Sequence, residues 1–179
     1  MTSPRVRPGR LRELGPINWV VWRVVSRVQG TPDAHLFSTL GRAGGLFRGW
    51  LHYGGRLLPG GGKLSRRQSE LVILRVAHRR DCGYELDHHI RRGRRAGITS
   101  DVLDWTRIGP AADGWSPRER ALLSAVDQLL DTRDIDDATW AALAAFYDDR
   151  RLLEIVLLAV HYDGLATTIG TLRIQRDFS

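Results

Sequence analysis

The chain has 179 residues, a formal net charge of +7 and a composition of 42% hydrophobic and 26% charged residues. This length suits one domain, and these proportions exclude wholesale disorder. The single cysteine, Cys82, excludes an intrachain disulfide, a CxxC redox pair and a cysteine-rich zinc site. The longest strongly apolar run, Leu152–Val160, is interrupted by Glu154 and is shorter than the ~20 residues of a membrane span. With no apolar signal segment near the N-terminus, we expect a cytoplasmic protein that does not enter a membrane.

Charge is unevenly distributed along the chain. Residues 1–62 carry a net charge of +7, residues 63–95 carry +6 and residues 96–179 carry −6. The basic part is open to two interpretations, a surface for nucleic acid or another anion and a solvated arginine-rich surface. Few aromatic residues lie among the arginines, no known nucleic-acid motif is present and the last part is acidic. These features favour the second interpretation, and the asymmetry also favours self-association.

Helix signals dominate the first third of the chain. Pro16 is suited to open a helix that runs to about Gln29. Its apolar face would consist of Trp19, Val20, Trp22 and Val24. The segment 35–53 is periodic but rich in glycine, which predicts a helix pair or an interrupted helix. A loop is expected over residues 57–62.

Helix signals continue through the rest of the chain. Ser65 and Gln68 form a capping box at the start of a buried helix. Asp81 is expected to cap the next helix, which would end at Gly97 in the left-handed conformation. Further helices are expected over 99–107, 116–130, 136–147 and 149–172, with caps at Thr99 or Ser100, Ser116 and Asp136. In the last helix, the side chains expected to point inward are Leu152, Leu153, Val156, Leu157 and Val160.

No convincing strand is found, because no turn dipeptide joins two alternating runs. The predicted fold class is therefore all-α, with about eight helices. We expect a basic N-terminal arm with the first helix over residues 1–30 and a helical domain over residues 31–179.

A group of residues that can carry chemistry lies on one predicted helix. Cys82, Glu85 and His89 fall at positions i, i+3 and i+7, so they share a face, and Glu85 is one turn from His89. A carboxylate there can orient an imidazole and raise its basicity. Glu70 lies 12 residues before Cys82 among apolar neighbours and would face the same place if the two helices pack together.

Each of these residues also has a purely structural interpretation. Glu85 and His89 can form a helix-surface pair worth a few tenths of a kcal/mol, Glu70 can compensate a helix dipole, and Cys82 can be a small buried hydrophobe. His88 is expected to be exposed among arginines. His161, in a polar triplet within the last apolar helix, is either a satisfied core histidine or a group of the site.

Metal binding is not expected. The adjacent residues His88 and His89 diverge by about 100° on a helix, so they would not share one ion. Neither an HExxH-type motif nor a phosphate-binding loop is present. We therefore predict a site without a metal.

The pattern of Glu70, Cys82, Glu85 and His89, followed by Ala96-Gly97-Ile98, resembles the carboxymuconolactone decarboxylase family, whose superfamily includes the alkylhydroperoxidase AhpD. The resemblance runs from about Thr31 to Leu172 and implies an AhpD-like helical bundle that assembles as a homo-oligomer, such as a dimer, trimer or hexamer. AhpD-like members use a glutamate, two cysteines and a histidine as a proton relay. In this chain Glu85 stands where the second cysteine would be, so a lone thiol cannot form the disulfide of that mechanism.

The resemblance therefore favours the decarboxylase-like branch, whose acid–base chemistry on lactones and related carboxylates needs no cofactor. His89 would be the general base or acid, Glu85 would orient it or take part directly, and Glu70 would relay a proton through water or Tyr84. The substrate would be a small anionic or aromatic molecule. Residues expected to bind it are His161, Arg75 and Arg92. The alternatives are a peroxide or thiol redox protein that uses Cys82 and, third, a non-enzymatic binding or scaffold protein.

Overall fold

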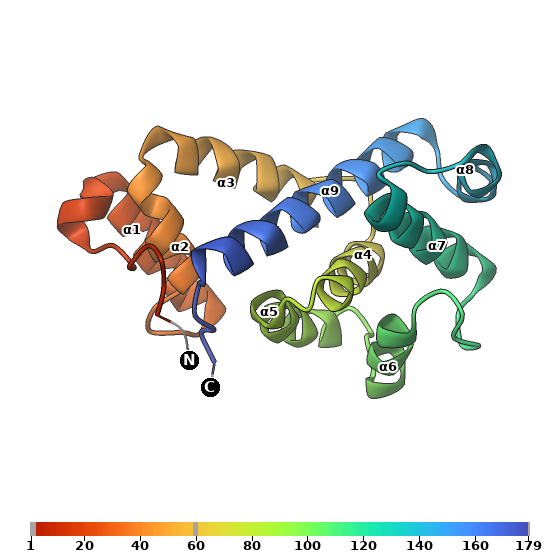
Figure 1. Ribbon diagram of the computed structural model, residues 1–179, viewed down its shortest axis with the longest axis horizontal. Helices are drawn as coiled ribbons and strands as arrows, with labels where there is room; N and C mark the ends of the chain where they lie inside the picture. Colours follow the sequence, from red (N-terminus) through yellow and green to blue (C-terminus); the bar gives the residue numbers. More distant parts are fainter. Residues whose placement is uncertain (1–2, 59–60, 179) are drawn as a thin grey trace. The chain divides into compact units, whose positions relative to one another are not determined.

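The computed structural model describes residues 3–58 and 61–178. This part of the chain is all-α, with nine α-helices, one short 3₁₀ helix and no strand, which confirms the predicted fold class (Figure 1). It forms two compact units: unit 1 comprises Met1–Gly55 and Thr167–Ser179, and unit 2 comprises Arg56–Ala166. The division predicted at residue 30 is a different one and stays a prediction. Residues 59 and 60 of the predicted loop lie outside the described residues.

Unit 1 contains the first helices of the chain. They are α1 (Leu11–Gln29), α2 (His35–Leu40), the 3₁₀ helix η1 (Gly41–Ala43) and most of α3 (Gly45–Leu57). Gly15 has a φ of +67°, which separates the first turn of α1 from the helix predicted to open at Pro16. Gly44 has a φ of +60° and separates η1 from α3. The glycine-rich segment is therefore an interrupted helix, as the sequence predicted.

The apolar face predicted for α1 is wrong in part. Trp22 is buried, but Val20 and Val24 are 53% and 57% exposed. The buried positions of the helix recur every four residues, at Leu14, Asn18, Trp22 and Ser26. Because two residues along a helix differ by about 200° in direction, Val20 and Val24 point away from this face.

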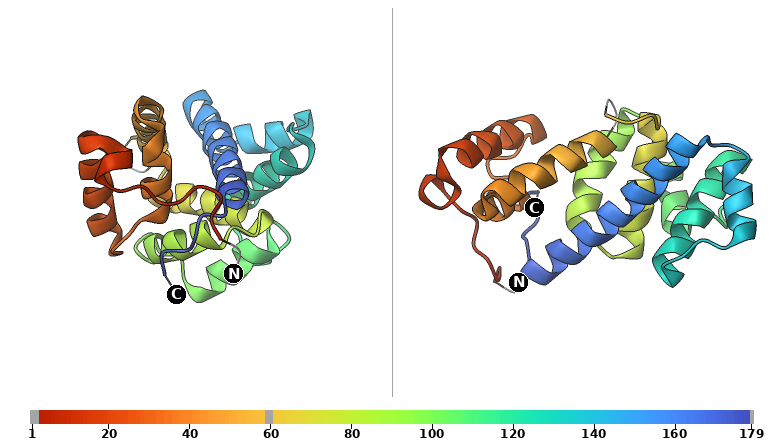
Figure 2. Two further views of the ribbon diagram at one scale, coloured as in Figure 1. Left: turned by 60° about the vertical axis from the view of Figure 1, so that its left-hand side comes forward. Right: turned by 90° about the horizontal axis from the view of Figure 1, so that it is seen from above.

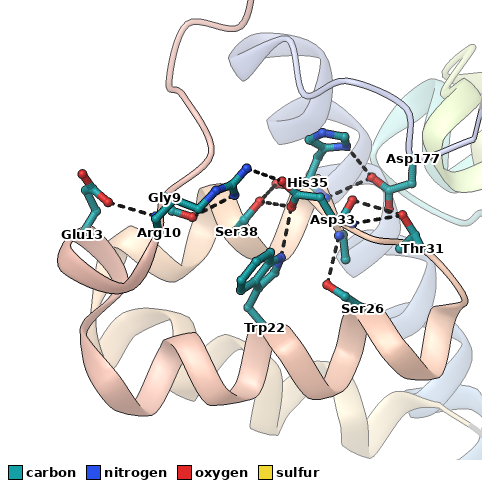
Figure 3. A network of polar contacts seen from close by, with 11 residues as sticks. Gly9, Arg10, Glu13, Trp22, Ser26, Thr31, Asp33, His35, Ser38 and Asp177 are labelled. Carbon is teal, nitrogen blue, oxygen red and sulfur yellow. Dashed lines mark hydrogen bonds and ion pairs between the residues drawn. The ribbon is translucent and has the colours of Figure 1, made fainter.

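A network of polar contacts holds unit 1 together (Figure 3). Asp177 accepts hydrogen bonds from the backbone N–H of His35, at 2.9 Å, and from its Nδ1, at 2.8 Å. Asp33 accepts hydrogen bonds from the indole of Trp22 and the hydroxyl of Ser38. The hydrogen bond to Asp177 raises the pKa of His35 above 6.5, against the effect of burial. The segment after α9 is thus tied to the first turn of α2.

Unit 2 is built around a central helix. Its helices are α4 (Arg66–Arg79), α5 (Gly83–Arg94), α6 (Ser100–Ile108), α7 (Pro117–Thr132), α8 (Asp137–Ala144) and the larger part of α9 (Asp149–Leu172). α4 contacts α5, α6 and α7, and α8 lies against α7 (Figure 2). The core between α4, α6 and α7 includes Leu71, Leu74, Val102, Trp115 and Leu123. This arrangement buries α4 from Ser69 to Ala77, which explains why most of that stretch is apolar.

The helix caps follow the sequence signals closely. Four predicted caps are confirmed: Ser65, Thr99, Ser116 and Asp136. The predicted cap Asp81 is wrong, because the chain turns there with a φ of +48° and Cys82 occupies the N-cap position of α5. Gly97 is left-handed as predicted, with a φ of +76°, although α5 itself already ends at Arg94.

The helix α9 corrects two expectations. Over its 24 residues it is long and apolar enough to cross a membrane, although half of its most apolar stretch is buried within the protein. This is weak evidence of a membrane span, because the core helix of a soluble protein has the same properties.

In the inward face predicted for α9, Leu152 is buried as predicted, but Leu153, Leu157 and Val160 are 64%, 45% and 52% exposed. They lie outside the face of α9 that carries Ile155, Leu158, Ala159 and Tyr162 into the core.

Candidate active site

His89 on α5 is held between two carboxylates inside unit 2. Its Nδ1 lies 2.7 Å from Oε2 of Glu70, and its Nε2 lies 3.3 Å from Oε2 of Glu85. The three side chains are only 3–5% exposed. Because a carboxylate can only accept a hydrogen bond, Nδ1 carries the proton that it donates to Glu70. The structure thus brings together three of the residues singled out from the sequence.

The local sequence explains how these groups meet. The capping box at Ser65 fixes the start of α4, and Glu70 follows in the buried middle of that helix. Glu85 lies in the first turn of α5, where an acidic side chain favours the helix dipole, and one turn later comes His89. Since α4 packs directly against α5, Glu70 reaches His89 without an intermediary. This direct contact takes the place of the predicted relay through water or Tyr84.

Tyr162 on α9 is a fourth member of the site, which sequence reasoning did not assign. Its hydroxyl lies 3.3 Å from Nε2 of His89, and its ring meets the imidazole edge-on, with the centroids 5.2 Å apart. The sequence signal that pointed to it was the polar triplet His161-Tyr162-Asp163 within an apolar helix, of which only His161 was assigned to the site.

The charges of the two glutamates set the proton affinity of the site. Burial lowers the pKa of His89, but the hydrogen bonds and charges of Glu70 and Glu85 outweigh it and raise the pKa above 6.5. Burial and the same two carboxylates raise the pKa of Tyr162 well above 10, against the charge of Arg92. Tyr162 therefore keeps its hydroxyl proton at neutral pH, and the imidazole of His89 holds its second proton more tightly than a free histidine does.

Cys82 begins α5 as a buried thiol. Burial raises its pKa to about 11, helped by the charge of Glu85 and opposed only in part by the backbone N–H groups of Glu85 and Tyr84. A thiol with this pKa is almost wholly protonated at neutral pH and is a poor nucleophile in that form.

Tyr84 and His88 pack against each other on the same helix. Their ring centroids are 4.8 Å apart and the planes are inclined by 38°. His88 is 7% exposed, so the prediction that it is exposed is wrong. The arginines that follow His88 in the sequence did not reveal its burial, because burial depends on which parts of the helix the rest of the fold covers.

The two arginines assigned to the substrate have different surroundings. Arg75 is 4% exposed and donates to both carboxylate oxygens of Asp127 and to the carbonyl oxygens of Thr106 and Arg107. These contacts occupy four of its five N–H groups, so Arg75 connects α4 to α6 and α7 and is not free to hold a substrate.

Arg92 is half-buried, and its charge acts on Tyr162. Within the part of the chain that the structure describes, its side chain has no hydrogen bond or ion pair. His161 is also half-buried, with its ring centroid 5.5 Å from that of Tyr162. Burial lowers the pKa of His161, against the charge of Glu85. Two of the three residues predicted to bind substrate, Arg92 and His161, therefore lie near Tyr162 of the His89 site.

Across residues 3–58 and 61–178, no group of three or more His, Cys, Asp or Glu side chains is arranged to hold a metal ion. The chemistry available at the site from the described side chains is proton transfer by an imidazole, two carboxylates and a phenol.

The fold is that of AhpD-like proteins. A peroxidase-related protein from Ralstonia eutropha JMP134, described as an alkylhydroperoxidase AhpD core, matches with a TM-score of 0.85 at 18% identity, over 99% of this chain and 94% of that one. The debrominase Bmp8, as a cysteine-to-alanine variant in complex with 2,3,4-tribromopyrrole, matches with a TM-score of 0.78 at 13% identity, over 99% and 94% of the two chains. At these identities the likeness shows the fold alone.

Sequence comparison finds a family similarity over part of the chain. Residues 44–128 match the carboxymuconolactone decarboxylase family, and these residues include Glu70, Cys82, Glu85 and His89. The protein YdfG of Bacillus subtilis (strain 168) is 24% identical over 97 residues, which are 53% of this chain and 66% of that protein's own length. The family match spans just under half of the chain and includes the His89 site, and the solved structures show an AhpD-like fold around it.

Proposed function

We propose that the protein is a cofactor-independent acid–base enzyme that acts on a small carboxylate, lactone or enol substrate. The observation that carries this proposal is the buried imidazole of His89, whose Nδ1 is held by Glu70 and whose Nε2 faces Glu85. A carboxylate on one ring nitrogen fixes the tautomer and leaves the other nitrogen to exchange protons. The raised pKa makes this imidazole a stronger base than a free histidine.

The chemistry follows from the two states of His89. In an isomerisation, neutral Nε2 removes a proton from the carbon beside a carbonyl group, the electron pair moves into an enolate, and the imidazolium returns the proton to another carbon. In a decarboxylation, the bond between the ring carbon and the carboxylate breaks, carbon dioxide leaves, and the imidazolium protonates the carbon that keeps the electron pair. Neither route needs an oxidant or a metal.

Arg92 is the proposed anchor for the substrate carboxylate. A half-buried guanidinium near Tyr162 offers a charge and a planar set of donors that match a carboxylate. His161, whose pKa is lowered by burial, would be mostly neutral and would contact the rest of the substrate as a hydrogen-bonding group.

The test is turnover of a panel of small lactone and enol carboxylic acids, with 4-carboxymuconolactone among them, in deuterium oxide. Mass spectrometry follows the release of carbon dioxide and the incorporation of deuterium. We expect turnover by the wild type and a loss of about 10²–10⁴-fold in His89→Ala, with a loss also in Glu85→Gln. His52→Ala, at an exposed position of α3, is the control and should keep the wild-type rate. Full turnover by both site variants contradicts the proposal, as does a wild type inactive on the whole panel.

A second candidate is a peroxide or thiol redox protein that uses Cys82. It is favoured by the position of the thiol at the start of α5 beside Glu85, and opposed by a pKa of about 11. With one cysteine, the oxidised thiol would have to be reduced by a thiol from another molecule. The reactivity of Cys82 separates this candidate from the first.

A further inference from the structure

Nε2 of His89 has two neighbours that suit opposite protonation states. Glu85 can only accept, so it is a partner for Nε2 when this nitrogen carries a proton. The hydroxyl of Tyr162 can donate, so it is a partner for Nε2 when this nitrogen has a free lone pair. Both lie at 3.3 Å, and Nδ1 is already engaged with Glu70 at 2.7 Å.

We propose that Tyr162 is a positioning residue of the site. Its hydroxyl donates a hydrogen bond to Nε2 of neutral His89, and when the imidazole is protonated Nε2 donates to Glu85 instead. The imidazole ring does not have to move for this exchange, because Glu70 holds Nδ1 in both states. The edge-on contact between the two rings keeps the hydroxyl beside Nε2. Tyr162 thereby stabilises the neutral imidazole, and Glu85 stabilises the imidazolium.

The groups around His89 support this division of roles. α4 supplies Glu70, α5 supplies Glu85 and the cation Arg92, and α9 supplies Tyr162 and His161. The carboxylates favour the charged imidazole, whereas the charge of Arg92 acts on Tyr162, whose pKa it lowers. Tyr162 is the one member of this group that can donate a hydrogen bond to Nε2 at 3.3 Å while itself uncharged.

For turnover the inference rests on the proposed function. In the isomerisation the neutral imidazole is the form that removes a proton from substrate, so a residue that stabilises it lowers the pH at which the enzyme becomes active. Loss of the Tyr162 hydroxyl would move the acidic limb of the pH profile upward, with a smaller effect on the rate at its plateau.

The experiment is a ¹⁵N NMR titration of the imidazoles in the full-length protein, which needs no substrate. The wild type should show His89 with a protonated Nδ1 and a titrating Nε2. In Tyr162→Phe the midpoint of that titration should rise by about 0.5–1 pH unit, which corresponds to one neutral hydrogen bond. In Glu85→Gln the midpoint should fall instead. Tyr147→Phe is the matched control, because Tyr147 is an equally buried phenol whose partner is Gln68, and it should leave the midpoint unchanged.

Opposite shifts in Tyr162→Phe and Glu85→Gln support the proposal. A midpoint that is unchanged or lower in folded Tyr162→Phe overturns the proposal. If Tyr162 only packed against the ring, loss of its hydroxyl would not raise the midpoint. If Tyr162→Phe does not fold, the wild-type spectrum decides: neutral His89 must be protonated at Nδ1, and protonation at Nε2 overturns the proposal. If the titrations behave as expected while His89→Ala keeps full turnover, the positioning role stands and the proposed function fails.

Discussion

Two histidines in this protein bind a carboxylate through Nδ1 in very different surroundings. His35 on α2 in unit 1 is 24% exposed and has Asp177 as its partner. His89 on α5 in unit 2 is 3% exposed, with Glu70 as the corresponding partner. Asp177 also accepts from the backbone N–H of His35, so that pair fixes a segment of the chain. Nε2 of His89 instead faces Glu85 and Tyr162. A histidine–carboxylate pair becomes a candidate for acid–base chemistry through what surrounds the second nitrogen.

The largest expected difference between the two pairs is in catalysis. Glu70→Gln should lower turnover on the best substrate of the panel by about 10²–10³-fold, because the tautomer and the basicity of His89 are no longer fixed. Asp177→Asn should leave turnover unchanged. Steady-state rates of the two purified variants against the wild type measure the difference, and equal losses in both would remove the distinction.

The thiol next to the His89 site should react slowly. A pKa raised from 9.0 to about 11 leaves about a hundredfold less thiolate at pH 7.5 than an unshifted cysteine has. Labelling of Cys82 with a chromogenic disulfide should therefore be slow in the native protein and fast in the unfolded one. Rapid labelling of the native protein at pH 7.5 would favour the redox candidate over the acid–base enzyme.

The two pairs should also contribute differently to stability. Glu70→Gln removes one carboxylate from a buried charged cluster and should lower the free energy of unfolding by about 2–3 kcal/mol. Asp177→Asn acts at a partly exposed pair and should cost about 1 kcal/mol. Urea unfolding followed by circular dichroism gives both values. A larger cost for Asp177→Asn would show that the pair in unit 1 is the more tightly coupled one.

The smallest expected effect is the pH dependence of the His35–Asp177 pair. The pKa of His35 is higher in the folded protein than its value of 6.5 in the unfolded chain. The stabilisation from the charged pair is therefore complete below pH 6.5 and is lost as the pH rises through the folded-state pKa. Asp177→Asn should cost more stability at pH 6 than at pH 8.5. An equal cost at both values would mean that the charge of His35 plays no part.

The sequence predicts local features of the site well. Glu85 and His89 lie one turn apart, so their contact follows from helix geometry, and the spacing to Glu70 pointed to the preceding helix. Four helix caps were likewise predicted, because a cap depends on residues within one turn. Tyr162 was not assigned to the site, since its contact with His89 joins residues 73 positions apart and depends on how α9 packs in unit 2.

Burial and long-range pairing explain the predictions that were wrong. Arg75 was expected to hold a substrate carboxylate, but it binds Asp127, which is 52 residues away. The sequence around Arg75 does not indicate this partner. His88 was expected to be exposed, and Val20 and Val24 were expected to be inward. For these residues the sequence showed the polarity of the neighbours, whereas exposure depends on which face of the helix the rest of the fold covers.

The most direct test of the central claim compares two curves for the wild-type protein in the same buffer. One is the pH dependence of turnover on the best substrate of the panel, and the other is the NMR titration of His89. Turnover should change through the His89 titration and share its midpoint above pH 6.5. Turnover that stays constant while His89 changes its protonation state would contradict the assignment of this histidine as the acid–base group.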